Sequence, residues 1–262
     1  MDRLRTSAGG VSLKNPLICA SGEHTMTAAG IRAALAAGAG AVVAKSVNES
    51  AAAKAQLDKT DYALLDGRGA LQPWGTATAQ TGLFCRSGLI QQSFEQWMAE
   101  LQALDAEAAA CGSYVIPSLI LSDLAQCVDY AGRIQTMGLR VLEVNIGAPH
   151  GEEAARGAIQ LERNADRIEH ITRSVRQATT LPLWIKLTGQ SEDVAGMADA
   201  ARRGGADAVI LMGRFMGFMP DLDTQGAVLN TSAAWGGSWA LPLTARWLAL
   251  SRKRLGRGFP LI

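Results

Sequence analysis

Cysteine is scarce in this sequence, and its cysteines are not grouped. The 262 residues contain four cysteines, none in the Cys-x-x-Cys spacing that metal sites and redox disulfides use. No cysteine pattern for an iron–sulfur cluster is present either, so such a cluster would have to come from a partner subunit. We therefore expect no metal site and four free thiols, at Cys19, Cys85, Cys111 and Cys127.

Long apolar runs and an excess of one charge are also lacking. No stretch of about 18 apolar residues occurs, and the basic N-terminus is not followed by the apolar segment of a signal peptide. Lysine and arginine total 25 against 24 aspartates and glutamates, so no strong field favours nucleic acid or an acidic membrane. These absences predict a cytoplasmic protein that acts on a small-molecule substrate, without nucleic-acid or membrane partners.

Short apolar segments do occur, and they alternate with longer segments of helical periodicity. The apolar segments are apolar on both faces, which is typical of strands in a buried parallel sheet. They cover residues 15–21, 41–46, 114–121, 141–146, 183–187 and 208–212, with 259–262 as the start of a seventh. Helices are predicted between them at residues 28–37, 94–111, 124–137, 161–179 and 194–203. This pattern predicts one α/β domain spanning residues 1–262.

Glycines follow several of these helices and favour one α/β architecture. Gly38-Ala-Gly-Ala-Val-Val resembles Gly204-Gly-Ala-Asp-Ala-Val-Ile, and this recurrence predicts a (β/α)₈ TIM barrel. A doubly wound sheet is disfavoured because no GxGxxG turn follows the first strand. A closed barrel needs eight strands, so we expect truncation within strand seven, with strand eight and its flanking helices missing. Left-handed helix ends are predicted at Gly38, Gly112, Gly138 and Gly204.

Two long insertions interrupt the alternation, at residues 48–92 and 213–239. Both contain glycine, proline, tryptophan or methionine, as loops that cover an active site often do. In a barrel, the loops that follow the strands form the active-site face. We expect these insertions to cover the site.

Four motifs at predicted strand ends follow one another in the order of a known family. They are Asn15-Pro-Leu-Ile-Cys-Ala-Ser-Gly, Ala41-Val-Val-Ala-Lys-Ser, Leu142-Glu-Val-Asn-Ile-Gly-Ala-Pro-His and Leu181-Pro-Leu-Trp-Ile-Lys-Leu. They resemble the dihydroorotate dehydrogenase family, including the FMN-binding domain of dihydropyrimidine dehydrogenase. The resemblance implies an FMN-dependent oxidoreductase that acts on a CH–CH bond of a pyrimidine-like substrate.

Two lysines end otherwise apolar strands. Burying the ammonium of Lys45 or Lys186 is costly unless an anion or polar ligand meets it. Reduced flavin carries negative charge near N1 and O2, and the resemblance implies that both lysines contact FMN. The alternative for each lysine is an ion pair with a carboxylate at the rim. A further alternative makes Lys186 the Schiff-base lysine of an aldolase-like barrel.

The resemblance assigns further ligand contacts to small and polar residues at strand ends. Small residues let the backbone approach a flat ring closely. Asn145 both donates and accepts hydrogen bonds, which suits a pyrimidine ring, and Gln91 stands where the family has a second substrate asparagine. The remaining FMN contacts implied by the resemblance are Ala20, Ser21, Gly22, Ser46, Ser118, Asn145, Gly213, Gly236 and Gly237.

The sequence departs from the family where a proton must move. Ala148 stands where the dehydrogenases carry the cysteine or serine that exchanges the substrate proton, which an alanine cannot do. His150, with an ordinary pKa of about 6.5, and Cys85 are candidate replacements. After the sixth strand, Met212-Gly-Arg replaces a hydrogen-bonding pair of the family. The alternative interpretation is a catalytically decayed barrel that binds a ligand or partner. A homo-oligomer or an electron-transfer partner subunit is expected.

Overall fold

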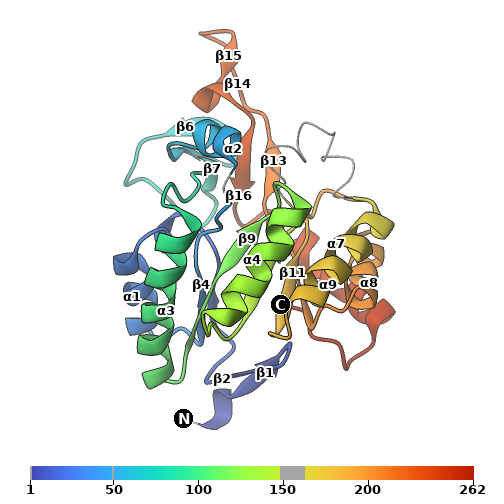
Figure 1. The fold of residues 1–262 in the computed structure, drawn as a ribbon. Coiled ribbons are helices and arrows are strands. Elements are labelled where there is room, and N and C mark those ends of the chain that lie inside the picture. The colour runs from blue at the N-terminus through green and yellow to red at the C-terminus, as the bar shows by residue number, and fades with distance from the viewer. Residues whose placement is uncertain (1, 49, 148–162) are drawn as a thin grey trace.

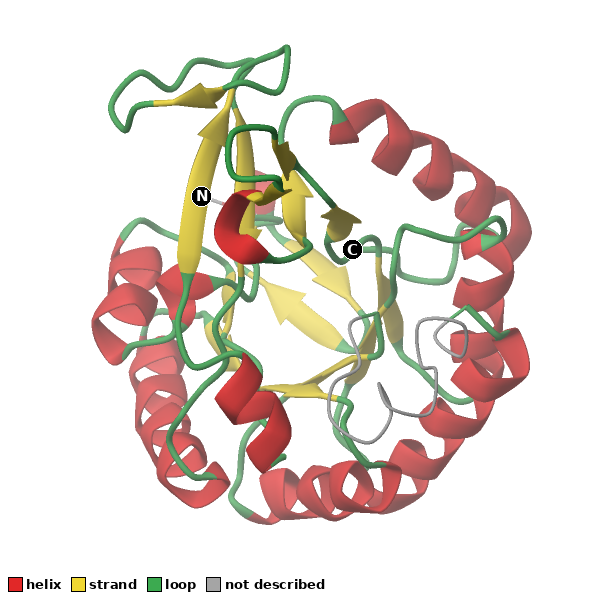
Figure 2. Cartoon of the chain, turned by 90° about the horizontal axis from the view of Figure 1, so that it is seen from above, coloured by secondary structure: helices red, strands yellow, loops and turns green. Residues whose placement is uncertain are grey.

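Parallel strand segments form the centre of the molecule. The structure is a computed structural model that describes residues 2–48, 50–147 and 163–262. The strands pair in chain order, and Figure 2 looks down into a curved sheet surrounded by helices. They are β3 (Ile18–Cys19), β4 (Ala41–Val43), β8 (Tyr114–Ile116), β9 (Ser118–Ile120), β10 (Leu142–Asn145), β11 (Leu183–Lys186) and β12 (Ala208–Ile210). β8 and β9 are the two halves of one strand, so these segments make six strand positions, and a single parallel bridge from Val209 to Leu261 adds a seventh.

The predicted α/β alternation is confirmed, with two differences in the strands. The first strand is reduced to Ile18–Cys19, and the third is interrupted at Pro117, which has no N–H to donate. β4 nevertheless pairs with both halves of the third strand, with β8 directly and with Leu119 of β9 through Val47. In the described ranges no strand pairs with the outer side of β3 or of Leu261. The closed eight-stranded barrel therefore stays a prediction.

Helices surround the sheet, and polar residues define where they begin. The N-cap side chains of Thr27, Ser93, Asp123, Asn164 and Asp193 each accept a backbone N–H three residues further on, which satisfies a donor that the first turn leaves free. No described helix has the length and apolar character needed to cross a bilayer. The helices are α1 (Ala28–Ala36), α2 (Ala51–Gln56), α3 (Phe94–Ala110), α4 (Leu124–Thr136), α7 (Ala165–Ala178), α8 (Val194–Arg203) and α9 (Ala240–Leu255).

Three of the four predicted left-handed glycines are confirmed. Gly38, Gly112 and Gly138 have φ of +94°, +67° and +80°. The prediction for Gly204 is wrong, because its φ is −71° and its N–H still bonds to Ala200 as part of helix α8. The left-handed residue is Gly205, with φ +100°. Because Gly204 and Gly205 are adjacent, the sequence did not show which of them follows the end of the helix.

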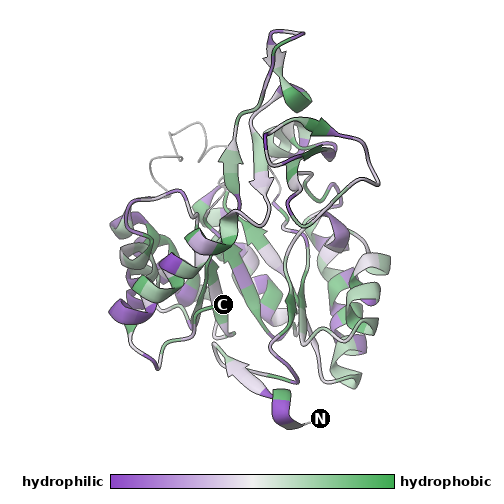
Figure 3. Cartoon of the chain, turned by 180° about the vertical axis from the view of Figure 1, so that it is seen from behind, coloured by the Kyte–Doolittle hydropathy of each residue, from purple (hydrophilic) through white to green (hydrophobic). Residues whose placement is uncertain are grey.

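Both faces of the parallel strands are buried, as predicted. Val42 and Ile185 pack against the helices, whereas Val43 and Trp184 point to the inside of the curved sheet. Figure 3 shows the contrast between the hydrophobic strands and the helices, which carry both hydrophobic and hydrophilic residues. Successive strand residues point to opposite faces, so an apolar run without alternation supplies both cores at once.

A hairpin that the sequence analysis did not predict covers the amino ends of the strands. It consists of β1 (Thr6–Ala8) and β2 (Val11–Leu13), preceded by the short helix η1 (Asp2–Leu4). The Trp184 indole Nε1 donates to the Gly9 carbonyl oxygen at 3.2 Å. A side chain on Gly9 has no room, since a Cβ there would lie 2.5 Å from that indole nitrogen. The hairpin thus closes the end of the core opposite the candidate site (Figure 1).

The two long insertions combine into one antiparallel sheet above the carboxyl ends of the parallel strands (Figure 1). The first insertion supplies β5 (Asp61–Leu65), β6 (Leu71–Gln72) and β7 (Gly82–Arg86), and the second supplies β13 (Phe215–Gly217) and β16 (Ala233–Gly236). β16 pairs with β7, which joins the two insertions. The second insertion also carries the small hairpin of β14 (Pro220–Asp221) and β15 (Gly226–Ala227), and then η3 (Val228–Asn230).

Candidate functional site

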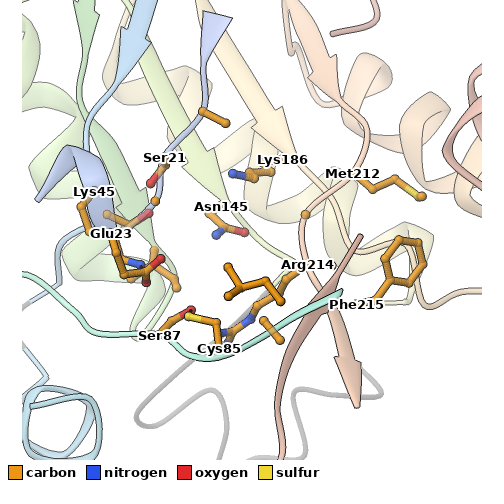
Figure 4. Close-up of a pocket in the computed structure, with 18 of the residues that line it drawn as sticks. Ser21, Glu23, Lys45, Cys85, Ser87, Asn145, Lys186, Met212, Arg214 and Phe215 are labelled. Carbon is orange, nitrogen blue, oxygen red and sulfur yellow. Dashed lines mark hydrogen bonds and ion pairs between the residues drawn. The ribbon is translucent and has the colours of Figure 1, made fainter. Parts of the chain in front are cut away.

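A cavity of about 450 Å³ lies between the carboxyl ends of the parallel strands and this antiparallel sheet. Its volume falls within the range of small-molecule sites. Figure 4 shows Ser21, Asn145 and Lys186 on one side of the cavity and Cys85, Ser87 and Arg214 on the other. The prediction that both insertions contribute to the cover of the site agrees with this lining, because Cys85 comes from the first insertion and Trp235 from the second.

Lys45 forms an ion pair at the edge of the cavity. It follows β4, and its Nζ donates to Glu23 Oε1 at 2.6 Å, with little of either side chain exposed. Glu23 belongs to the short helix η2 (Glu23–Thr25), which follows β3. Burial alone would raise the pKa of Glu23, but the charge and hydrogen bond of Lys45, a backbone hydrogen bond and Ser87 outweigh burial and lower it. Lys45 is therefore paired with a carboxylate, which was the alternative to a flavin contact for this lysine.

Lys186 has no such partner. It ends β11, only 9% of the residue is exposed, and it lines the cavity. Among the described residues its ammonium makes no hydrogen bond or ion pair, and Figure 4 shows it directed into the cavity. A buried ammonium without a counter-charge is costly. This lysine is the strongest sign that the cavity receives a polar or anionic ligand.

Asn145 and the small residues after β3 also line the cavity, as predicted. The Asn145 side-chain oxygen accepts the Gly147 N–H at 3.0 Å, which fixes the orientation of the amide. Its amide nitrogen finds no partner within the described part of the chain. The cavity lining also includes Ala20, Ser21, Gly22, Ser46, Gly213 and Gly236.

Ser118 lies behind the cavity rather than in its wall. It is fully buried, its Oγ lies 2.8 Å from Ser46 Oγ, and it donates to Glu143 Oε1 at 2.6 Å. Glu143 is itself only 1% exposed. Ser118 thus connects Ser46 in the lining to a buried carboxylate that the sequence analysis did not single out.

The antiparallel sheet brings a thiol to the cavity. Cys85 on β7 is 6% exposed, and its Sγ lies 3.8 Å from Ser87 Oγ. Burial raises the pKa of this thiol, and the charge of Glu23 raises it further, while Ser87, Lys45 and Arg214 act in the opposite direction. At neutral pH Cys85 is therefore a protonated thiol rather than a thiolate.

Other predicted site residues are not brought to the cavity. The Gln91 side chain is exposed, and its amide nitrogen donates to the backbone carbonyls of Lys54, Leu57 and Leu89. Gly237 is exposed and lies outside the lining, beside Gly236. Ala148 and His150 lie outside the described residues. No group of three or more metal-binding side chains comes together in the ranges that the structure describes.

Glu23 and Ser87 are the functional candidates that sequence reasoning missed. Glu23 is in the Ser-Gly-Glu-His segment, which the sequence analysis used only to argue against a dinucleotide turn. The sequence did contain a signal for this ion pair. Glu23 and Lys45 carry opposite charges, and each follows a strand end. Parallel strand ends meet at one edge of a sheet, so such residues come together.

The fold and the cavity define an α/β protein with a cavity of small-molecule size at the carboxyl edge of a curved parallel sheet. The sequence is 28% identical over 246 residues to the dihydroorotate dehydrogenase B (NAD(+)) catalytic subunit of Methanocella arvoryzae, covering 93% of this chain and 73% of the relative. It is 28% identical over 253 residues to a putative dihydroorotate dehydrogenase A (fumarate) of Pediococcus pentosaceus, covering 95% and 76%. The resemblance stated above is confirmed: over about nine-tenths of its length the chain is similar to proteins named dihydroorotate dehydrogenase.

Two other comparisons add little. No protein-family model matches the sequence. The carboxyl transferase domain of Rhizobium etli pyruvate carboxylase aligns with 43% of this chain and 19% of that chain, at 17% identity and a TM-score of 0.34. A likeness this weak supports no argument about fold or function.

Proposed function

We propose that this protein is an FMN-dependent oxidoreductase acting on a CH–CH bond of a pyrimidine-like substrate. The observation that carries the proposal is Lys186, a buried ammonium without a partner in the described residues, directed into a cavity of about 450 Å³. The names of the relatives, dihydroorotate dehydrogenases, supply the reaction class. The architecture we propose to go with it is a single TIM-barrel domain.

The residues of the cavity fit a flavin ring. Lys186 offers a positive charge to the pyrimidine edge of the ring, where reduction places negative charge. Ala20, Gly22, Gly213 and Gly236 are small residues of the lining that would let the ring approach the backbone closely. When bound, FMN accepts or supplies the hydride of the reaction. Asn145 would hold the substrate by its free amide nitrogen, with Ser21 and Ser46 as further polar contacts.

The reaction also needs an electron acceptor or donor outside this chain. Several relatives are named as catalytic subunits of NAD(+)-type enzymes. We propose that a partner subunit exchanges electrons with this protein in the same way, although homo-oligomers remain an alternative assembly.

The decayed barrel is the second candidate function. It is favoured by the Glu23–Lys45 ion pair, which neutralises one of the two lysines that the resemblance assigns to the flavin. It is also favoured by Ala148 in the sequence, which cannot exchange a proton. Such a protein would bind a ligand or partner without turnover.

The visible absorption spectrum of the purified chain, before and after addition of FMN, tests the proposal. We expect flavin bands near ~450 nm that persist through gel filtration. Lys186→Met should weaken FMN binding, whereas Lys253→Met, at an exposed position on α9, should not. Flavin binding with turnover of a dihydropyrimidine supports the oxidoreductase. Flavin binding without turnover of any dihydropyrimidine supports the decayed barrel, and a protein that takes up no FMN contradicts the FMN-dependent oxidoreductase.

A further inference from the structure

We propose that the Cys85 thiol exchanges the proton at the substrate carbon, in the position of acid and base that Ala148 cannot fill. This inference rests on the proposed function and names the missing proton donor of the same site.

Cys85 lies in the wall of the cavity. β7 crosses the cavity on the side away from the strand ends, so Cys85 and Lys186 lie on opposite walls of one cavity (Figure 4). Lys186 and the small residues after β3 would hold a flat ring at the strand ends, and the space toward β7 would then be available to the substrate. The thiol would face the substrate from that side. Proton and hydride would reach the two carbons of the bond from opposite faces.

Lys186 is the independent sign that this cavity holds a ligand. It is a nine-tenths buried cation directed into the same space, and it has no partner within the described residues. Cys85 therefore faces a site built for a polar or anionic ligand, which separates it from the buried Cys127 in the core. Cys111 is exposed and far from the cavity lining.

A proton path leads away from the thiol. Ser87 Oγ lies 3.8 Å from Cys85 Sγ, and the Ser87 hydroxyl also interacts with the carboxylate of Glu23. Glu23 in turn accepts a hydrogen bond from Lys45. These groups connect the thiol to solvent-reachable polar atoms at the edge of the cavity.

In the direction of reduction, Cys85 donates the proton. The S–H bond of Cys85 breaks and a C–H bond forms at one carbon of the double bond, leaving a thiolate. The other carbon receives the hydride, and with it the electron pair, from the reduced flavin of the proposed function. The thiolate regains a proton from water by way of Ser87 and Glu23. In the direction of oxidation the same thiol must first lose its proton.

The groups that face Cys85 explain why it works as an acid. Burial and the charge of Glu23 hold its pKa above the ordinary value, and Lys45 and Arg214 compensate only in part. Tyr62, paired with Cys85 across β5 and β7, has a pKa raised to about 12 by burial, Glu23 and Cys85, so it stays neutral. We therefore expect oxidation to speed up with rising pH more steeply than reduction.

Alkylation of Cys85 and turnover test the inference together. Wild type, Cys85→Ser and Cys85→Ala are compared with Cys111→Ser as the matched control. Because the pKa of Cys85 is raised, its modification by iodoacetamide should require alkaline pH, and a bound dihydropyrimidine should protect Cys85 but not the exposed Cys111. Cys85→Ala should keep the FMN spectrum and lose about 10²- to 10⁴-fold in turnover, the usual effect of removing a general acid or base. It should also lose exchange of the substrate carbon-bound hydrogen with D₂O.

The outcomes separate the two proposals. Wild-type turnover that Cys85→Ala and Cys85→Ser both retain overturns the role of Cys85 and leaves the proposed function standing. A wild-type protein that binds FMN but turns over no dihydropyrimidine overturns the proposed function, and the inference with it. Loss of turnover in both variants with an unchanged flavin spectrum supports both.

Discussion

Lys45 Nζ lies 2.6 Å from Glu23 Oε1, while the other lysine of the cavity, Lys186, has no counter-charge in the described residues. Lys45 follows β4 and Lys186 ends β11, and in the sequence both were lysines at the end of an apolar strand. In the structure Lys45 is ion-paired at the edge of the cavity, whereas the ammonium of Lys186 is available to a ligand. This asymmetry underlies the predictions below.

Removal of the Glu23 charge should destabilise the protein in a pH-dependent way. Glu23→Gln leaves the buried Lys45 ammonium without a counter-charge, and we expect a loss of about 1–3 kcal/mol in the free energy of unfolding at pH 7. The pKa of Glu23 is lowered from the ordinary 4.5, so its contribution is present above that value and is lost as the pH falls through the lowered pKa. Urea unfolding at pH 7 and at about pH 3 measures the difference.

The control for this prediction is Glu192→Gln, an exposed glutamate beyond the cavity lining. It should change stability little at either pH. A Glu23→Gln deficit that is as large at low pH as at neutral pH would show that the pair contributes through packing rather than charge.

Replacement of Lys186 should separate stability from ligand binding. Lys186→Met removes a buried ammonium that has no partner among the described residues and keeps the aliphatic part of the side chain, so we expect unfolding free energy to stay equal or rise by up to ~1 kcal/mol. FMN affinity should fall at the same time. Thermal unfolding and a flavin titration give the two quantities, with Lys253→Met as the matched control. A marked loss of stability would mean that Lys186 has a structural partner in the folded protein.

The buried carboxylate of Asp105 should be essential for stability but not for the site. It accepts two hydrogen bonds from Arg140, at 2.7 and 2.6 Å, and one from the Val115 N–H at 2.8 Å. Asp105→Ala removes the acceptor of the Arg140 Nε and of the buried Val115 N–H, while Arg140 Nη2 keeps its bond to the Ser113 carbonyl, and we expect a loss of about 1–3 kcal/mol in unfolding free energy. Glu107 lies on the same helix as Asp105 and forms an exposed ion pair with Arg32, so Glu107→Ala should have little effect. Chemical denaturation of both variants provides the comparison.

The sequence by itself determined the alternation of strands and helices and the family. Strands that are apolar throughout, such as Ala41–Val43 and Leu183–Lys186, follow from local pattern alone, because both faces of each strand are buried. Helix starts at residues such as Ser93 and Asp123 are equally local, since a cap bonds to a backbone group three residues away. The carboxyl ends of parallel strands meet at one edge of the sheet, so Lys186 and Asn145 were expected to lie at that edge.

The tertiary structure decided which of these residues meet. The Glu23–Lys45 pair and the pairing of β7 with β16 join segments that are distant in the sequence and whose patterns are too irregular to predict. Gln91 illustrates the opposite case, since the family resemblance assigned it to the substrate, whereas in the structure its amide nitrogen donates to backbone carbonyls outside the cavity. Local pattern specifies where a strand ends, but the direction of a side chain beyond that end depends on partners from distant parts of the chain.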